Sequence, residues 1–228
     1  MKNLIFLFSI LFLLSLNSCI GDDIIDDRVD PFLRISNPID SLEFNTSYQF
    51  ETVFLNNVGK ETNIDLEWSS SDPATIEVSN SGLITANQLG NAIITGMGEA
   101  PSGEMVKTDH LIVVGNSTVI TVIEERTGDL ETSSSYALEG SFNLKEINGV
   151  LTLSFDDNYE ASSALPGLFV YLTNNPSTTS GAYEIGAVTV FDGAHSYELP
   201  SNIDIMDYDY VLYFCKPFNV KVGDGQFD

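Results

Sequence analysis

A cysteine in the C-terminal half is the best candidate for chemistry in this sequence. Cys215 follows Tyr210–Phe214, an aromatic and aliphatic run typical of a buried β-strand. Lys216 and Pro217 then interrupt the strand, because proline cannot donate to a β-ladder and is confined to strand ends, edges and bulges. A second strand is expected next, with three apolar residues on one face: Phe218, Val220 and Val222. The pattern predicts a thiol that stays accessible at the rim of a β core.

Cys215 has no expected disulfide partner. The only other cysteine, Cys19, belongs to a lipidation motif described below. An unpaired cysteine in an oxidising compartment indicates a reactive thiol or an intermolecular bond. Reactivity requires the thiolate, which a nearby cation favours. Lys216 is the only adjacent cation, and it points to the opposite face unless a bulge at Pro217 turns it. The alternative is a small buried structural residue, a common state of free cysteine.

Haem ligation is the one cofactor hypothesis that the sequence leaves open. No C-x-x-C-H motif is present, which excludes covalent c-type attachment. The candidate axial ligands in the C-terminal half are His195, Met206 and Cys215, and His195 lies in a turn where a solvent-exposed side chain is expected. The sequence has no Ser-His-Asp signature, phosphate-binding loop or zinc-ligand spacing. It therefore indicates a redox module rather than a conventional enzyme.

The N-terminus predicts export and lipid anchoring. Residues 1–18 begin with Lys2 and continue with an apolar run, as in a secretory signal peptide. Leu16-Asn17-Ser18-Cys19 resembles the lipobox of bacterial lipoproteins, which implies that Cys19 is the lipidated first residue of the mature chain. Residues 19–30 form an acidic tether that resembles surface-export signals of some Gram-negative lipoproteins, or is simply a solvated spacer. We expect attachment to the outer membrane or the cell surface.

The charge of the chain restricts its partners. Lys and Arg number 9 against 33 Asp and Glu, and the formal net charge is −24. Such a chain disfavours nucleic acid, which requires basic patches. Four acidic groups were candidates for calcium: Asp22-Asp23, Asp26-Asp27, Asp156-Asp157 and Asp207 with Asp209. No EF-hand loop is present, so solvated surface carboxylates and no metal site are the better prediction.

Residues 31–116 predict a β-sandwich, with short alternating strands separated by Gly, Asn and Pro turns. The segment is similar to the bacterial Ig-like group 2 domain in four motifs: Trp68–Pro73, Ile76–Val78, Ser81–Ala86 and Leu89–Thr95. The resemblance implies a spacer or adhesion module with Trp68 in the core between two sheets. His110 alternates with Leu111 in a strand and is expected to be structural.

Residues 117–228 predict a second antiparallel β-sandwich or barrel-like domain without a substantial helix. Val119–Glu125 is expected to be its first strand, and residues 126–135 a polar turn. Asn148-Gly149 predicts a tight hairpin, because both residues accept positive φ.

This segment resembles the extracellular DM-thirteen domain, usually described as an electron-transfer domain. The carrying motifs are Gly140–Phe142, Leu151–Phe155, Pro166–Leu172, Tyr183–Gly186, Ser196–Pro200 and Val211–Val220. The resemblance implies that Cys215 is the redox residue and that a redox partner exists. We therefore expect an envelope lipoprotein that presents an electron-transfer domain on an Ig-like stalk. The alternative is a non-enzymatic adhesion or binding protein, whose loops hold a glycan or a surface protein through exposed aromatics such as Tyr159, Tyr197 or Tyr208.

Overall fold

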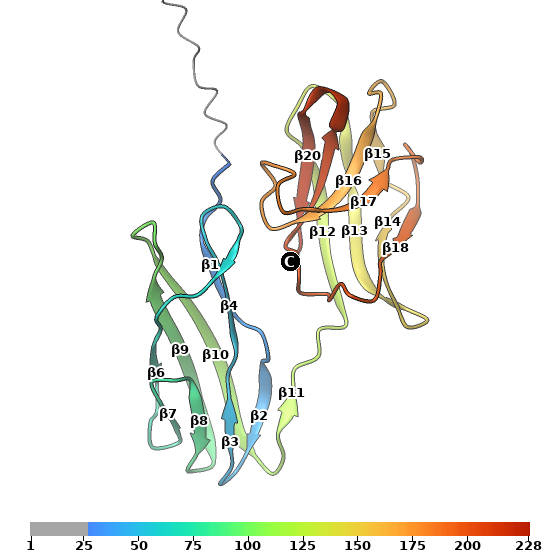
Figure 1. The fold of residues 1–228 in the computed structure, drawn as a ribbon. Helices are drawn as coiled ribbons and strands as arrows, with labels where there is room; N and C mark the ends of the chain where they lie inside the picture. Colours follow the sequence, from blue (N-terminus) through green and yellow to red (C-terminus); the bar gives the residue numbers. More distant parts are fainter. Residues whose placement is uncertain (1–26) are drawn as a thin grey trace, which may run out of the picture.

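The computed structural model describes residues 27–228, whose regular structure is β-sheet apart from one three-residue 3-10 turn at Lys216–Phe218. Figure 1 shows two lobes, an N-terminal one in blue to green and a C-terminal one in yellow to red. The predicted all-β fold is confirmed. The predicted leader, Cys19 and the tether up to residue 26 lie outside the described residues. Within residues 27–228, no helix has the length and apolar character needed to cross a bilayer.

The N-terminal lobe is a sandwich. Its strands are β1 (Phe32–Ile35), β2 (Ile39–Glu43), β3 (Ser47–Gln49), β4 (Thr52–Leu55), β5 (Glu61–Thr62), β6 (Glu67–Ser70), β7 (Ile76–Val78), β8 (Leu83–Ala86), β9 (Gly90–Glu99), β10 (Met105–Gly115) and β11 (Val119–Ile120). One sheet has the order β11-β2-β10-β9-β6, and two small sheets, β1-β4-β5 and β3-β8-β7, pack against it. The pairing of β2 with β10 is parallel and every other pairing in the sandwich is antiparallel.

The core of the sandwich explains the positions of its aromatic residues. Trp68 is partly buried and stacks on Phe50 with ring centroids 6.0 Å apart. Gly82 and Gly96 face its indole, where an added Cβ would lie 2.9 and 3.1 Å from ring atoms. His110 is a structural residue, since its Nε2 lies 2.7 Å from the carbonyl oxygen of Ile39.

Apolar residues alternate over Tyr48–Phe54 as in one strand, but the chain forms two strands there. β3 pairs with β8, whereas β4 pairs with β1 in a different sheet. Phe50 lies between them and is buried, because the chain inserts this ring into the core as it passes from one sheet to the other. Alternation alone cannot predict such a switch.

The C-terminal lobe is one nine-stranded sheet that curls into a near-barrel. Its strands are β12 (Glu125–Thr132), β13 (Leu138–Ile147), β14 (Val150–Phe155), β15 (Glu160–Ala161), β16 (Leu168–Thr173), β17 (Tyr183–Ala187), β18 (His195–Glu198), β19 (Tyr210–Cys215) and β20 (Val220–Gln226). The order is β17-β16-β19-β20-β12-β13-β14-β18, with β15 beside β13, and every pairing is antiparallel. The predicted hairpin joins β13 to β14, with φ of 54° at Asn148 and 80° at Gly149.

Two expectations at the start of this lobe are wrong. Within the expected strand at Val119–Glu125, only Val119–Ile120 forms a strand of its own, β11, which pairs with β2 of the sandwich; Glu125 begins β12. The expected turn after Arg126 is instead β12, with Arg126 and Leu130 pointing inward. Gly128 makes this segment look less like a strand in the sequence. Glycine is nevertheless required there, because a Cβ would lie 2.2 Å from the carbonyl oxygen of Gln226.

The two lobes are in direct contact. Asn175 Nδ2 donates to the carbonyl oxygen of Val58 over 3.2 Å. Gly59, at φ of 72°, approaches so closely that an added Cβ would lie 2.3 Å from the carbonyl oxygen of Asn174. Arg34 of β1 forms an ion pair with Asp209, just before β19. The C-terminal lobe therefore folds back beside the start of the described chain (Figure 1).

Candidate redox site

Cys215 is enclosed by the C-terminal core. It is the last residue of β19, where Val211, Tyr213 and Cys215 point into the near-barrel and each is fully buried. Its thiol points toward the carbonyl oxygen of Pro166, with Sγ 3.6 Å from that atom. The expectation of an accessible thiol at the rim of the core is therefore wrong. Cys215 is the only free cysteine among residues 27–228.

A tight turn encloses the thiol. Gly167 has φ of 81°, in the left-handed region that favours glycine, and a Cβ there would lie 2.8 Å from Cγ of Pro217. The amide of Lys216 donates to the carbonyl oxygen of Gly167 over 3.1 Å. Pro217 stops β19 as predicted, but the chain then forms a 3-10 turn. Phe218 and Val220 are consequently exposed, and only Val222 of the expected apolar face is buried.

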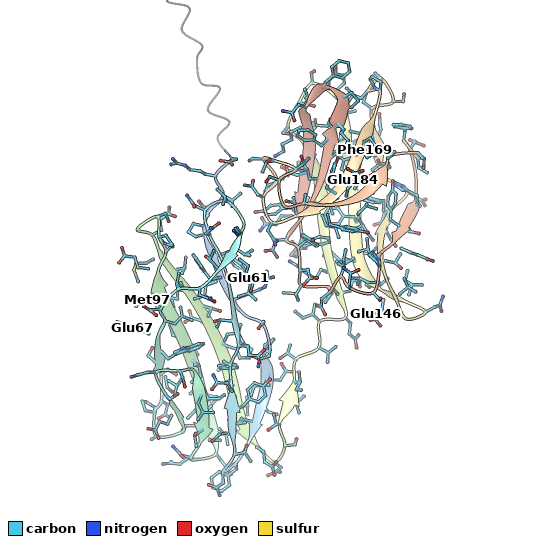
Figure 2. The ribbon with its side chains drawn as sticks, in the orientation of Figure 1. Glu61, Glu67, Met97, Glu146, Phe169 and Glu184 are labelled. Carbon is cyan, nitrogen blue, oxygen red and sulfur yellow. The ribbon has the colours of Figure 1, made fainter. Side chains whose placement is uncertain are left out.

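Lys216 does not approach the thiol. Its Nζ lies 2.7 Å from the carboxylate of Glu184 and 4.8 Å from the ring centroid of Phe169, and the Lys216 and Glu184 side chains are 55% and 39% exposed. Figure 2 labels Glu184 and Phe169 in the C-terminal lobe. The hydrogen bond from Lys216 lowers the pKa of Glu184. The alternation of the strand therefore directs the only adjacent cation away from Cys215, and the local bulge does not reverse it.

An aromatic cluster lies in the same core as Cys215. Phe155 of β14 stacks on His195 with centroids 4.8 Å apart, and Tyr159 meets His195 edge-on at 4.5 Å. Tyr213 lies 6.1 Å from Tyr159. Tyr197 follows on β18, two residues after His195 and 5.5 Å from its ring. The cluster is therefore assembled from β14 and β18, which are neighbours at one end of the sheet, from β19, and from the loop before β15.

Sequence reasoning did not find this cluster. Tyr159 was expected to be an exposed aromatic residue, but it is 1% exposed because its loop folds over the open end of the near-barrel. His195 was expected to face solvent, and it is instead part-buried against Phe155. The available signal was the spacing of His195 and Tyr197, which places both on one face of a strand.

This lobe is similar to a known protein family. Residues 130–227 match the family model described as Electron transfer DM13. The matched segment, called the DM13 segment below, begins inside β12 and ends after β20, so it contains Cys215 and the aromatic cluster. Comparison with curated proteins gives no match.

The structure does not bring the three candidate haem ligands of the DM13 segment into one site. Cys215 and His195 belong to the interior described above, whereas Met206 lines a cavity between the lobes. Neither Cys215 nor His195 lines that cavity. The backbone oxygen of Met206 accepts a hydrogen bond from Arg34, which fixes this residue as part of the contact between lobes.

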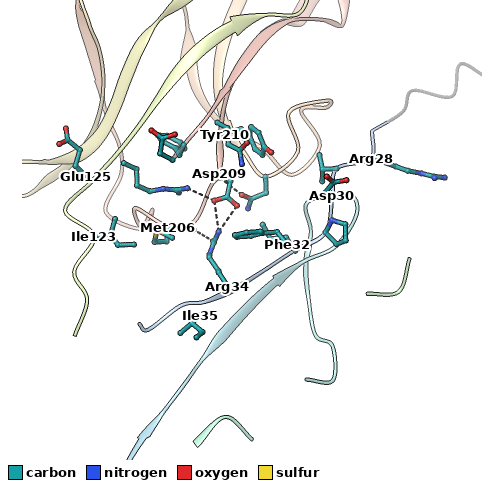
Figure 3. Close-up of a pocket in the computed structure, with 18 residues that line it drawn as sticks. Arg28, Asp30, Phe32, Arg34, Ile35, Ile123, Glu125, Met206, Asp209 and Tyr210 are labelled. Atoms are coloured by element: carbon teal, nitrogen blue, oxygen red, sulfur yellow. Dashed lines mark hydrogen bonds and ion pairs between the residues drawn. The ribbon is translucent and has the colours of Figure 1, made fainter. Parts of the chain in front are cut away.

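A buried charge cluster holds the DM13 segment to the sandwich. Asp209 accepts hydrogen bonds from Arg34 at 3.0 Å and from Arg126 at 3.1 Å (Figure 3). Burial lowers the pKa of Arg126, whereas the charge of Asp209 opposes that shift. Asp209 was predicted to be a solvated carboxylate, and this is wrong because the two guanidinium groups cover it.

These residues line a cavity of about 950 Å³ between the lobes. All three arginines of the chain line it, with Asp30, Glu125, Asp209 and Asp228 supplying negative charge. Asp156, Asp157 and Asp207 are exposed, and in the part of the chain that the structure describes no group of three or more His, Cys, Asp or Glu side chains could hold a metal ion.

Proposed function

We propose that this protein is a lipid-anchored envelope protein whose DM13 segment transfers electrons, with Cys215 as its redox thiol. The match of residues 130–227 to an electron-transfer family is the observation that carries the proposal. The lipobox around Cys19 supports attachment to the outer membrane or cell surface. The N-terminal sandwich is then the Ig-like module of the same chain, and the acidic tether joins it to the membrane.

Burial determines how Cys215 can react. A thiolate exchanges by direct attack on a disulfide sulfur, so a fully buried Sγ must first be uncovered. The turn at Pro166-Gly167 is the element to move, since it contacts both Sγ and Pro217. Attack on a partner disulfide would then form a mixed disulfide and release one partner thiolate. Because the mature chain has no second thiol, a thiol from another molecule must resolve that bond.

Thiol labelling of the folded protein tests this mechanism. We expect Cys215 to react slowly with a disulfide reagent under native conditions and rapidly in denaturant, with Cys215→Ser abolishing the reaction. A redox titration against glutathione should show a thiol couple in the wild type and none in the variant. Labelling that requires denaturation, together with unchanged redox behaviour of Cys215→Ser, would refute a redox role for the thiol.

A binding function is the second candidate, and an exposed apolar strip favours it. Ile93 and Leu111 face each other across β9 and β10 and are 44% and 56% exposed. Val113 extends this strip along β10. The strip has no aromatic residue on which a sugar ring could stack, so it suits a protein surface better than a glycan. Binding to a surface protein that Leu111→Asp abolishes would support this function, and a glycan array tests the carbohydrate alternative.

A further inference from the structure

Buried polar atoms without partners gather at one place in the DM13 segment. Among residues 27–228, seven buried side-chain nitrogen or oxygen atoms make no hydrogen bond. Four of the seven belong to the aromatic cluster: the hydroxyls of Tyr159, Tyr197 and Tyr213, and Nε2 of His195. Buried polar groups in folded proteins are nearly always hydrogen-bonded, so four unpaired atoms in one place indicate a group that binds there.

The three hydroxyls are close enough to act on one another. Burial raises the pKa of Tyr159 to about 12, and the nearby Tyr213 and Tyr197 modify it. Burial likewise raises the pKa of Tyr213 well above its ordinary value, with further contributions from Tyr159 and Tyr197. The rings of Tyr159 and Tyr213 have centroids 6.1 Å apart, and the ring of His195 lies 4.5 Å from Tyr159 and 5.5 Å from Tyr197, so the four side chains form one contiguous group in the core.

His195 adds an unpartnered ring nitrogen to the same group. Its Nδ1 lies 3.0 Å from the carbonyl oxygen of Gly193, an atom that can only accept, so Nδ1 carries the proton. In the neutral ring Nε2 is then the unprotonated nitrogen, and it is buried without a partner. A backbone carbonyl that fixes the far nitrogen in this way is the usual support of a metal-binding imidazole.

The backbone holds these side chains in place. Gly140 has φ of 126°, and a Cβ there would lie 2.5 Å from Cα of Tyr159, so only glycine allows the Tyr159 loop to lie this close to β13. The amide of Gly193 donates to the carbonyl oxygen of Tyr159 over 2.9 Å, which joins this loop to the turn before β18. Tyr213 is fixed by the pairing of β19 with β16 on one side and β20 on the other.

The donor set selects the ligand. Three phenol oxygens and one imidazole nitrogen are hard or borderline donors, and the carboxylates that Ca²⁺ and Mg²⁺ prefer are absent from the set. Three phenolates carry three negative charges, which a trivalent cation neutralises, whereas a divalent cation would leave one uncompensated charge in the core. A buried site with no net charge avoids the large cost of an isolated charge.

We propose that Tyr159, Tyr197, Tyr213 and His195 bind one ferric ion. This inference goes beyond the proposed function, because it assigns a redox centre that does not involve Cys215. On binding, each phenol forms an oxygen–iron bond and releases its proton to solvent, and Nε2 donates its lone pair without losing a proton. Three protons therefore leave for each ion bound, and the affinity falls by about a thousandfold for each unit by which pH is lowered.

Titration of the purified full-length protein with ferric nitrilotriacetate tests the site. We expect one equivalent to produce a visible phenolate-to-iron charge-transfer band and to raise the unfolding temperature. Tyr213→Phe should lose most of the band while remaining folded, since it removes only an unpartnered hydroxyl. His195→Gln should weaken binding at least tenfold. Tyr136→Phe, at a partly exposed residue outside the cluster, is the matched control and should bind as the wild type does.

Other results would overturn the inference. Iron binding without the band, or a band of equal intensity in Tyr213→Phe, would place the metal elsewhere. A high-resolution structure of iron-treated protein that shows only water between the hydroxyls would assign the cluster to buried solvent. Cys215→Ser should keep the band. Loss of the thiol couple therefore tests the proposed function of Cys215, and loss of the band tests the iron site.

Discussion

Substitution of Asp209 by asparagine tests how strongly the two lobes are joined. The Arg34 and Arg126 side chains are 11% and 7% exposed, and both contact the same carboxylate. Asn has nearly the same shape, but it removes the carboxylate that both buried guanidinium groups contact. Breaking a buried ion pair by removing one partner costs about 3–5 kcal/mol. For a chain of this length we expect the unfolding temperature to fall by roughly 10 °C.

A control variant at an exposed ion pair separates the effect of burial from the effect of losing an ion pair. Lys145→Gln, at a residue that does not line the cavity, removes an ion pair with Glu125 whose side chains are 41% and 42% exposed. Such a pair contributes about 0–1 kcal/mol, so this variant should unfold almost as the wild type does. Urea unfolding of both variants, followed by fluorescence of Trp68 in the sandwich and by circular dichroism for the whole chain, measures the difference. If Asp209→Asn lost no more stability than Lys145→Gln, the cluster would not hold the lobes together and the argument from burial would fail.

The remaining predictions concern the thiol, the tyrosines and one surface pair. Gly167→Ala places a Cβ against Pro217 at a positive φ, which costs about 1–2 kcal/mol. We expect this strain to open the turn and to speed native labelling of Cys215 roughly tenfold. Unchanged labelling would show that the turn does not cover the thiol. Burial raises the pKa of Tyr159 from 10.0 to about 12, so its contribution to stability is complete below pH 10 and is lost as pH rises toward 12. Ultraviolet titration should therefore show part of the tyrosinate absorbance appearing only at high pH, together with unfolding. Tyr159→Phe should reduce that part. Lys216→Gln should return the lowered pKa of Glu184 toward its ordinary value, as measured by carboxyl NMR titration, with little loss of stability because the pair is exposed.

Much of the architecture follows from local sequence. Asn148-Gly149 fixes a hairpin because both residues accept positive φ, and Tyr210–Cys215 forms a central buried strand because nearly every residue is apolar. Pro217 ends that strand as its chemistry requires. These features depend on one or two residues and their neighbours, so a single sequence is enough to predict them.

The sites depend on contacts between segments that are far apart in the chain, and such contacts cannot be predicted from local sequence patterns. Tyr159 is buried only because its loop folds against Gly140 and meets His195 and Tyr213 from other strands. Asp209 pairs with an arginine 175 positions earlier in the chain. Cys215 is enclosed by a turn almost 50 residues away, at Pro166. In each case the local pattern favours exposure, and tertiary packing reverses it.

The return of the C-terminal lobe to the beginning of the sandwich affects where the protein would meet its partners. Phe227 and Asp228 line the same cavity as Arg28 and Asp30, so the last residues of the chain lie beside the first ones described. If Cys19 is acylated, the residues between it and Asp27 span at most about 30 Å. The DM13 segment would then remain close to the lipid headgroups, and it would most readily meet molecules that diffuse laterally in the same leaflet.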